Sequence, residues 1–295
     1  MSTHDGETSS DHGSFLIGGD LPVRRVGFGT MRLTDASGDG TQAGAQIWRA
    51  SADAADAIAV LRRAVDLGVQ LFDTADAYAL GGNEELIAKA LHPYPDGVVV
   101  ATKVGLLRPT PTTWVPHGHP DYLKQQVELS LRRLRVDSID LLQLHRLDPT
   151  YSIADQVGAM AELREQGKIR HIGLSEVTVG ELDEARRVTL IAAVQNRYSL
   201  ADREHDPVID HAADRGIAFL PYFPLAIGEL ARTGSTVDIV ARELGVPRSQ
   251  VALAWLLHRN ENVIPIPGTS SIAHLEENTA AQTVRLSTEH LRLLA

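Results

Sequence analysis

Short apolar runs that alternate with helical patterns are the feature that most limits the fold of this chain. VRRVGFG (23–29) is the first run, and seven more follow it: VQLFDTA (69–75), VVVATKV (98–104), IDLLQLH (139–145), HIGLSE (171–176), IAAVQN (191–196), AFLPYF (218–223) and VIPIPG (263–268). Most of these runs are continuously apolar rather than alternating. Both faces of the predicted strands should therefore be covered, as in a parallel sheet.

Helical periodicity fills the intervals between these predicted strands. It covers residues 52–67, where Gly68 ends the pattern, and then 83–91, 122–134, 153–167, 179–187, 206–216, 235–245, 248–260 and 271–282. Eight strand–helix units predict an α/β fold of the (β/α)8 TIM barrel type. The alternative is an open doubly wound sheet, which usually carries G-x-G-x-x-G after its first strand. GFG (27–29) and GDGTQAG (38–44) have neither that spacing nor that context.

The start of the chain completes the predicted domain organisation. SFLIGG and LPVRRVGFG flank a Gly-Gly-Asp turn, which predicts an N-terminal β-hairpin ahead of the barrel. Residues 1–13 are polar and acidic, without the basic start and apolar core of a signal peptide, and we expect a disordered tail there. Residues 14–295 should form a single barrel domain, because no linker or internal repeat interrupts the alternation.

Composition limits the partners of the protein. Of its 295 residues 43% are hydrophobic, which is enough for a sizeable core, and the net charge of −10 argues against a general binder of nucleic acid or anionic membranes. No apolar run reaches the length of a transmembrane helix. The absence of cysteine excludes disulfides and thiolate metal sites, and it fits a reducing compartment. We expect a cytoplasmic protein, and its oligomeric state stays open.

Four polar residues stand where predicted strands end or their loops begin. Asp73 ends one strand and Tyr78 follows in its loop, while Lys103 and His145 end the next two strands. Because the chemistry of a barrel sits where its strands end, this quartet could meet at one rim. Taken singly, Asp73 could be a turn or cap residue, Tyr78 a packing residue and His145 a core histidine. Lys103 is harder to explain alone, since a lysine that ends an apolar strand is costly without a partner.

The quartet has the groups needed to reduce a carbonyl. A tyrosine hydroxyl has a pKa of about 10, too high for efficient proton transfer near neutrality, and a lysine within reach should lower it. Asp73 would keep Lys103 charged and aimed, and His145 could bind a carbonyl oxygen. A metal-dependent hydrolase is a weaker alternative, because only Asp73 and His145 could be ligands and Lys103 would repel a cation. We therefore expect no metal.

Eight motifs follow one another over about residues 22–290: LFDTADAY, NEELIAKAL, VVVATKVG, IDLLQLH, HIGLSE, VQNRYSL, PYFPL and VIPIPGTSSIAHLEEN. In these motifs the sequence resembles the aldo-keto reductase family, and it is most similar to a bacterial branch that includes pyridoxal reductases. The resemblance implies a barrel that reduces an aldehyde or ketone with NADPH. Tyr78 would be the proton donor of a catalytic tetrad with Asp73, Lys103 and His145. A non-catalytic redox sensor or regulatory subunit, which binds the cofactor on the same fold, is the alternative.

The resemblance also implies a set of cofactor contacts. Ser175 and Gln195 match positions that hold the nicotinamide carboxamide, Tyr222 matches the ring that stacks on the nicotinamide, and Asn278 matches an adenine-binding position. Four residues before the last predicted helix could bind phosphate, where an ordinary N-cap needs only one hydroxyl: Gly268, Thr269, Ser270 and Ser271. The remaining implied contacts are Gly29, Thr30, Met31, Glu176, Pro224, Leu225, His274 and Glu277.

Two of these positions depart from the family pattern. Glu176 stands where the family usually has asparagine, and a carboxylate can accept from a carboxamide but cannot donate to its oxygen. His274 stands where many relatives carry an arginine for the adenosine 2′-phosphate. The preference for NADPH over NADH should therefore be weaker than usual, and NADH is a possible cofactor.

The segment after Lys103, GLLRPTPTTWVPHGHP (105–120), has two interpretations. It could line the substrate mouth, with Trp114 stacking on the substrate, or it could be an ordinary proline-rich surface loop. The expected substrate is a small carbonyl compound, with pyridoxal as one candidate.

Overall fold

The computed structural model describes residues 13–34, 47–225 and 234–295. A hairpin comes first, in which β1 (Ser14–Ile17) pairs antiparallel with β2 (Leu21–Arg24) across a turn that contains two glycines at positive φ. The predicted N-terminal hairpin is confirmed. Its apolar side chains pack in one cluster with the first residues of barrel strands, such as Leu71 and Val99, so the hairpin covers the amino end of the barrel. Residues 1–12 of the predicted tail lie outside the described residues.

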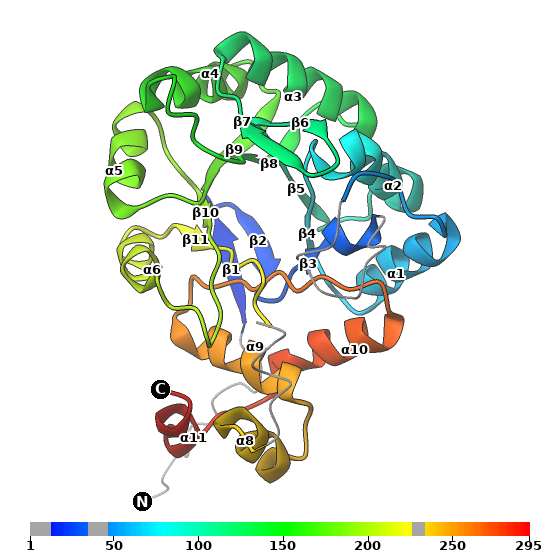
Figure 1. Ribbon diagram of the computed structural model, residues 1–295, viewed down its shortest axis with the longest axis vertical. Helices are drawn as coiled ribbons and strands as arrows, with labels where there is room; N and C mark the ends of the chain where they lie inside the picture. Colours follow the sequence, from blue (N-terminus) through cyan, green and yellow to red (C-terminus); the bar gives the residue numbers. More distant parts are fainter. Residues whose placement is uncertain (1–12, 35–46, 226–233) are drawn as a thin grey trace, which may run out of the picture.

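A curled parallel sheet is the centre of the molecule (Figure 1). Within the described chain it has seven strands, in the order β11 (Ala218–Phe219), β10 (Ala193–Gln195), β9 (Ile169–Ser175), β8 (Ile139–Leu144), β5 (Val99–Val104), β4 (Leu71–Asp73) and β3 (Phe28–Gly29). Every neighbouring pair is parallel. The strands are buried on both faces, as their continuous apolar runs predicted.

An extended segment, residues 262–267, closes this sheet into a barrel. On one side the Ile264 amide donates to the Phe219 carbonyl at 2.8 Å, and on the other the Gly29 amide donates to the Pro267 carbonyl at 3.2 Å. The segment is not a regular strand, because its two prolines have no N–H to complete the ladder. The predicted (β/α)8 barrel is confirmed, with an irregular eighth strand.

Helices surround the sheet in Figure 1. Those of the ring around the sheet are α1 (Ala54–Asp66), α2 (Gly82–Leu91), α3 (Pro120–Leu134), α4 (Ile153–Glu165), α5 (Val179–Val188), α6 (Asp206–Ala213), α9 (Arg248–Arg259) and α10 (Ile272–Ala280), while α8 (Thr236–Leu244) and α11 (Thr288–Leu293) lie farther from the sheet than α9. All the predicted helices are present, whereas α11 was not predicted because six residues are too few for a periodic pattern. A search of the described residues finds no helix with the length and apolarity needed to cross a membrane.

A second hairpin was also not predicted. β6 (Leu106–Thr110) pairs antiparallel with β7 (Thr113–Pro116), inside the segment that the sequence suggested as a loop. Its prolines hid the strand pattern, because proline within a run indicates a loop or an edge strand. The hairpin projects from the end of β5 over the barrel.

Arg25 stabilises the point where the barrel closes. Its side chain is buried, and its Nη2 atom donates to the carbonyls of Leu257 at 2.8 Å and Val263 at 3.2 Å. These carbonyls belong to the last turn of α9 and to the closing segment, where helix geometry supplies no donor. Burial lowers the pKa of Arg25 to about 10, which leaves it charged at neutral pH.

We expect Arg25→Met to lower the free energy of unfolding by about 2–3 kcal/mol, because buried carbonyls lose a charged donor. Urea unfolding at pH 7, followed by circular dichroism, measures the change. The exposed neighbour Arg24 provides the matched control, and Arg24→Met should cost less than about 0.5 kcal/mol. Equal losses for the two variants would show that Arg25 does not stabilise the closure.

Candidate active site

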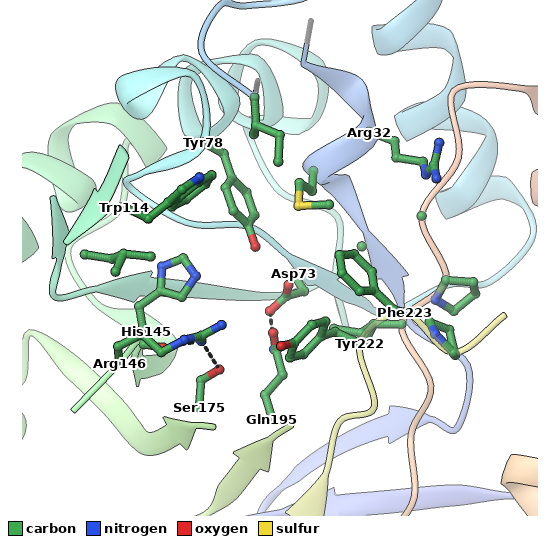
Figure 2. Close-up of a pocket in the computed structure, with 18 of the residues that line it drawn as sticks. Arg32, Asp73, Tyr78, Trp114, His145, Arg146, Ser175, Gln195, Tyr222 and Phe223 are labelled. Carbon is green, nitrogen blue, oxygen red and sulfur yellow. Dashed lines mark hydrogen bonds between the residues drawn. The ribbon is translucent and has the colours of Figure 1, made fainter. Parts of the chain in front are cut away.

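A cavity of about 810 Å³ lies at the carboxyl end of the barrel strands (Figure 2). Its wall is formed by residues at the ends of β4, β9 and β10 and in the segments that follow β3, β8 and β11. Asp73, Tyr78 and His145 line it, and Lys103 lies beneath them with 1% of its surface exposed. The structure thus brings the predicted quartet together at one rim.

A buried ion pair forms the floor of this site. The Lys103 ammonium contacts the Asp73 carboxylate with an Nζ–Oδ2 distance of 2.6 Å, and it donates to the carbonyl of Thr74 at 2.9 Å. The third donor of the ammonium points to the Tyr78 hydroxyl at 3.5 Å, at the outer limit of a hydrogen bond. Burial would lower the pKa of Lys103, but the Asp73 charge and the Tyr78 hydroxyl raise it above its ordinary value. The lysine is therefore charged at neutral pH.

Two glutamines donate hydrogen bonds to the second carboxylate oxygen of Asp73. The side-chain amides of Gln143 at 3.1 Å and Gln195 at 2.8 Å both donate to Asp73 Oδ1. Gln195, which the sequence assigned to the cofactor, lines the cavity and at the same time binds this carboxylate (Figure 2). Gln143 was not predicted. Its place two residues before His145 in a buried strand was the signal, since side chains two apart face the same side of a strand.

Tyr78 is held with its hydroxyl protonated. Burial raises the pKa of the Tyr78 hydroxyl above its ordinary value, and the Lys103 charge offsets this only in part. Lys103 lowers this pKa, as expected from the sequence, but the net shift in the protein without ligand is upward because desolvation of the phenolate is the larger effect. A phenol that keeps its proton at neutral pH is suited to donate it.

His145 faces the cavity beside Tyr78. The centroids of the two rings are 5.8 Å apart in an edge-to-face arrangement. Burial, together with the charges of Lys103 and Arg146, lowers the pKa of His145 well below its ordinary value, so its imidazole is neutral. Its Nδ1 atom is buried and has no hydrogen-bond partner among the described residues.

A tight turn after β4 aims the tyrosine. The Asp76 amide donates to the Lys103 carbonyl at 3.0 Å, and the two residues after Tyr78 have positive φ, which turns the chain sharply into α2. Asn83 ties this loop down by accepting from the Thr74 hydroxyl at 2.7 Å and donating to the Thr30 carbonyl at 3.1 Å. These bonds, which the sequence did not reveal, fix the distance between Tyr78 and Lys103.

Most of the residues predicted to bind the cofactor fall into two groups. Those that line the cavity are Gly29, Met31, Ser175, Gln195, Tyr222, Pro224, Leu225 and Gly268. Thr30 does not line it, because its side chain is fully buried and its hydroxyl donates to the Asp73 carbonyl at 2.8 Å. Thr30 therefore supports the loop from behind the cavity wall.

The other group lies along the start of α10, beyond Gly268. The Ser271 hydroxyl accepts from the His274 amide, and the Thr269 hydroxyl accepts from the Ser271 amide, so these two hydroxyls serve the helix end. Ser270 and His274 are exposed, and Asn278 is buried. The Glu277 carboxylate accepts a hydrogen bond from the Ser249 hydroxyl of α9.

Glu176 and Arg146 differ from what the sequence suggested. Glu176 has a φ of 57°, and its carboxylate accepts from the Arg197 amide at 2.6 Å, so it is committed to the backbone. Arg146 lines the cavity, and its Nη1 atom donates to the Ser175 hydroxyl at 3.1 Å (Figure 2). Arg146 was not predicted, although its place directly after His145 at the end of a strand could have drawn attention to it.

The β6–β7 hairpin contributes Trp114 to the wall of the cavity. The Trp114 ring centroid lies 6.4 Å from that of His145, and the Arg108 guanidinium carbon lies 3.4 Å from the Trp114 centroid on the indole. Arg108 is itself buried and donates to the Pro111 carbonyl at 2.7 Å. The structure therefore places Trp114 in the cavity wall, and its stacking on the substrate stays a prediction.

A protonated phenol beside a buried ammonium and a neutral imidazole is suited to move a proton to or from an oxygen, which is the chemistry of a carbonyl–alcohol oxidoreductase. Comparison with known proteins agrees with this class. The sequence model of the aldo/keto reductase family matches residues 25–295, and the chain belongs to this family. The resemblance inferred from the sequence is thereby confirmed, and the protein is an oxidoreductase of that family.

Three similar proteins place the chain within the family. An uncharacterized oxidoreductase of Schizosaccharomyces pombe is 44% identical over 271 residues, which are 92% of this chain and 85% of that protein. Pyridoxine 4-dehydrogenase of Escherichia coli is 40% identical over 282 residues, 94% of this chain and 95% of that protein. The structure of an aldo/keto reductase from Klebsiella pneumoniae in complex with NADP and acetate matches with a TM-score of 0.78 at 29% identity, covering 95% of this chain and 93% of that one.

The raised pKa of Tyr78 and the lowered pKa of His145 predict that the rate of carbonyl reduction is independent of pH between about pH 6.5 and 10. Because the pKa of Tyr78 is raised, its protonated, donating form persists at least up to the ordinary pKa of tyrosine. The rate falls only as the pH rises through the raised pKa of Tyr78. The pKa of His145 is lowered, so its neutral form is lost only at acid pH. The measurement is kcat/KM for the carbonyl substrate, which reports the pKa values of groups before that substrate binds. A loss of rate centred between about pH 7 and 9 would contradict the raised pKa of Tyr78.

Proposed function

We propose that this chain reduces the carbonyl group of a small aldehyde or ketone with NADPH, and that Tyr78 is the proton donor. The observation that carries the proposal is the position of Lys103. Its ammonium lies 2.6 Å from the Asp73 carboxylate and 3.5 Å from the Tyr78 hydroxyl, at the floor of a cavity large enough for a ligand.

Each member of the quartet has a distinct role in this proposal. NADPH, when bound, supplies the hydride that reaches the carbonyl carbon. Tyr78 donates its proton to the carbonyl oxygen, and the Lys103 charge stabilises the phenolate that remains. Asp73 keeps Lys103 charged and in place, and His145, as a neutral donor, orients the carbonyl oxygen.

The residues around the quartet suit the proposed cofactor. The Tyr222 ring and the Ser175 hydroxyl line the cavity, and no acidic residue faces it apart from Asp73 among the described residues of its wall. Glu176 is a carboxylate, so it cannot donate a hydrogen bond to the carboxamide oxygen, and it already accepts one from the Arg197 amide. Arg146, which lies beside Ser175, would provide that donor. NADP in the Klebsiella relative supports the choice of cofactor. The exposed His274 leaves NADH as an alternative.

For the substrate we propose a planar aromatic aldehyde, with pyridoxal as the first candidate. The Trp114 ring can stack on such a molecule, and Arg108 at 3.4 Å on the indole holds that ring in place. Apolar neighbours in the same wall, such as Ile47 and Leu106, suit a ring rather than a sugar. The E. coli relative named pyridoxine 4-dehydrogenase supports the same substrate class.

A sequence of 295 residues without cysteine supports a cytoplasmic location.

The direct test is to follow NADPH absorbance with the purified protein and a panel of pyridoxal, benzaldehyde, simple aliphatic aldehydes and sugar ketones. We expect consumption of NADPH, fastest with the aromatic aldehydes. Tyr78→Phe should lower kcat by about 100- to 10,000-fold, because the proton donor is lost, and should leave the Kd for NADPH within about twofold. Tyr151→Phe, outside the cavity wall, is the matched control and should retain full activity.

Two outcomes would count against the proposal. No consumption of NADPH with any carbonyl, together with tight NADPH binding, would favour the redox-sensor role. Turnover of Tyr78→Phe within about tenfold of the wild type would exclude Tyr78 as the proton donor.

A further inference from the structure

Arg32 is a charged residue of the cavity to which neither the sequence nor the proposed chemistry gives a role. It follows β3 in the short 3-10 helix η1 (Thr30–Leu33) and lines the cavity wall. Figure 2 shows it near the edge of the view opposite Trp114, so it lies away from the substrate end. A methyl group in place of the Gly268 hydrogen would be 3.7 Å from Arg32 Cγ, which puts the side chain directly beside Gly268.

The Arg32 guanidinium has no counter-ion among the described residues. Its Nη2 atom is buried and has no hydrogen-bond partner among the residues that the structure describes, and none of the ion pairs found among those residues includes Arg32. Asp73, the one carboxylate among the described residues of the cavity wall, is already bound by Lys103, Gln143 and Gln195. An arginine keeps its charge in proteins, and the buried Nη2 atom of this half-buried side chain would gain a partner if an anion bound in the cavity.

The position of Arg32 along the cavity indicates which anionic group of the proposed cofactor it would bind. Tyr78, Ser175 and Tyr222 mark the end where the proposed nicotinamide lies, and the start of α10 marks the proposed adenosine end. Gly268 lies between these two ends, in the segment that joins the closing strand to α10. Arg32, in the segment after β3, lies beside Gly268. The part of a dinucleotide that joins its two nucleosides is the pyrophosphate, which carries two negative charges and suits a planar fork of donors.

We propose that Arg32 binds the cofactor pyrophosphate, and so supplies affinity that NADPH and NADH share. The inference rests on the proposed function, since it needs a dinucleotide in this cavity. It differs from recognition of the 2′-phosphate, which would favour NADPH alone. In the absence of cofactor, the same unpaired charge destabilises the folded chain.

The test is the Kd of the full-length Arg32→Gln variant for NADPH and NADH by protein fluorescence, and for adenosine 2′-monophosphate by displacement of NADPH. We expect both dinucleotides to bind about 10- to 100-fold more weakly, by similar factors, because a charged hydrogen bond is lost from each. The Kd for adenosine 2′-monophosphate, which has no pyrophosphate, should not change. Arg32→Lys should recover part of the affinity, and Arg187→Gln, on the exposed face of α5, should behave as the wild type.

Thermal unfolding of the cofactor-free protein separates binding from a structural role. The Arg32→Gln midpoint should equal or exceed that of the wild type, while the upward shift caused by NADPH should be smaller. An unchanged Kd for both dinucleotides, a loss confined to NADPH, or a lower midpoint of the cofactor-free variant would each overturn the inference. If the wild type reduces carbonyls and Arg32→Gln still binds both cofactors normally, only the role of Arg32 is wrong. If the wild type binds neither dinucleotide, the proposed function falls as well.

Discussion

The buried ion pair between Lys103 and Asp73 is the interaction on which the rest of this site depends. Burying two opposite charges is favourable only when their remaining donors and acceptors are satisfied. Here the ammonium contacts Asp73, Thr74 and Tyr78, and the second carboxylate oxygen accepts from the two glutamines. The groups come from β4, β5, β8 and β10, so one polar cluster links four strands of the barrel to the catalytic tyrosine proposed above.

The same burial sets the protonation states that the proposed chemistry needs. Removing water raises the pKa of Tyr78 and lowers that of His145, so the first is an acid with its proton in place and the second a neutral donor. Lys103 stays charged because Asp73 is its neighbour. Burial in one site, together with the Asp73 charge, thus gives Tyr78, His145 and Lys103 the protonation states that the proposed reaction needs. The charge on Lys103 stabilises the site most when Tyr78 loses its proton and becomes a phenolate.

The elements with a strong local pattern were predictable from the sequence, and so was the meeting of the quartet. Strand ends of a parallel barrel lie at one rim whatever the details of packing, which is why Asp73, Lys103 and His145 could be placed together. The direction of individual side chains could not be predicted. Glu176 is turned by a backbone angle that no sequence pattern signals, and the net pKa of Tyr78 depends on burial that only the packed structure reveals.

The missed features share a dependence on long-range contacts. Arg32 became visible as a site residue only when segments far apart in the chain formed one cavity, and the β6–β7 hairpin was hidden by its prolines. The closing segment, by contrast, was predicted as the eighth strand, and its hydrogen bonds to Phe219 and Gly29 agree with this although its prolines interrupt the ladder. For Arg32 and for the β6–β7 hairpin the local signal was weak or misleading, and contacts with distant segments decided the outcome.

The central claim is that Lys103 and Asp73 act as one unit on Tyr78, and a double-mutant cycle in kcat tests it most directly. Lys103→Met, Asp73→Asn and the double variant would be compared at saturating NADPH and aldehyde, with thermal unfolding to confirm that each is folded. We predict that each single change lowers kcat by about 100-fold or more and that the double variant loses about as much as either one, because removing either partner already disables the pair. Losses that multiply in the double variant would show that the two residues act independently and would contradict this account.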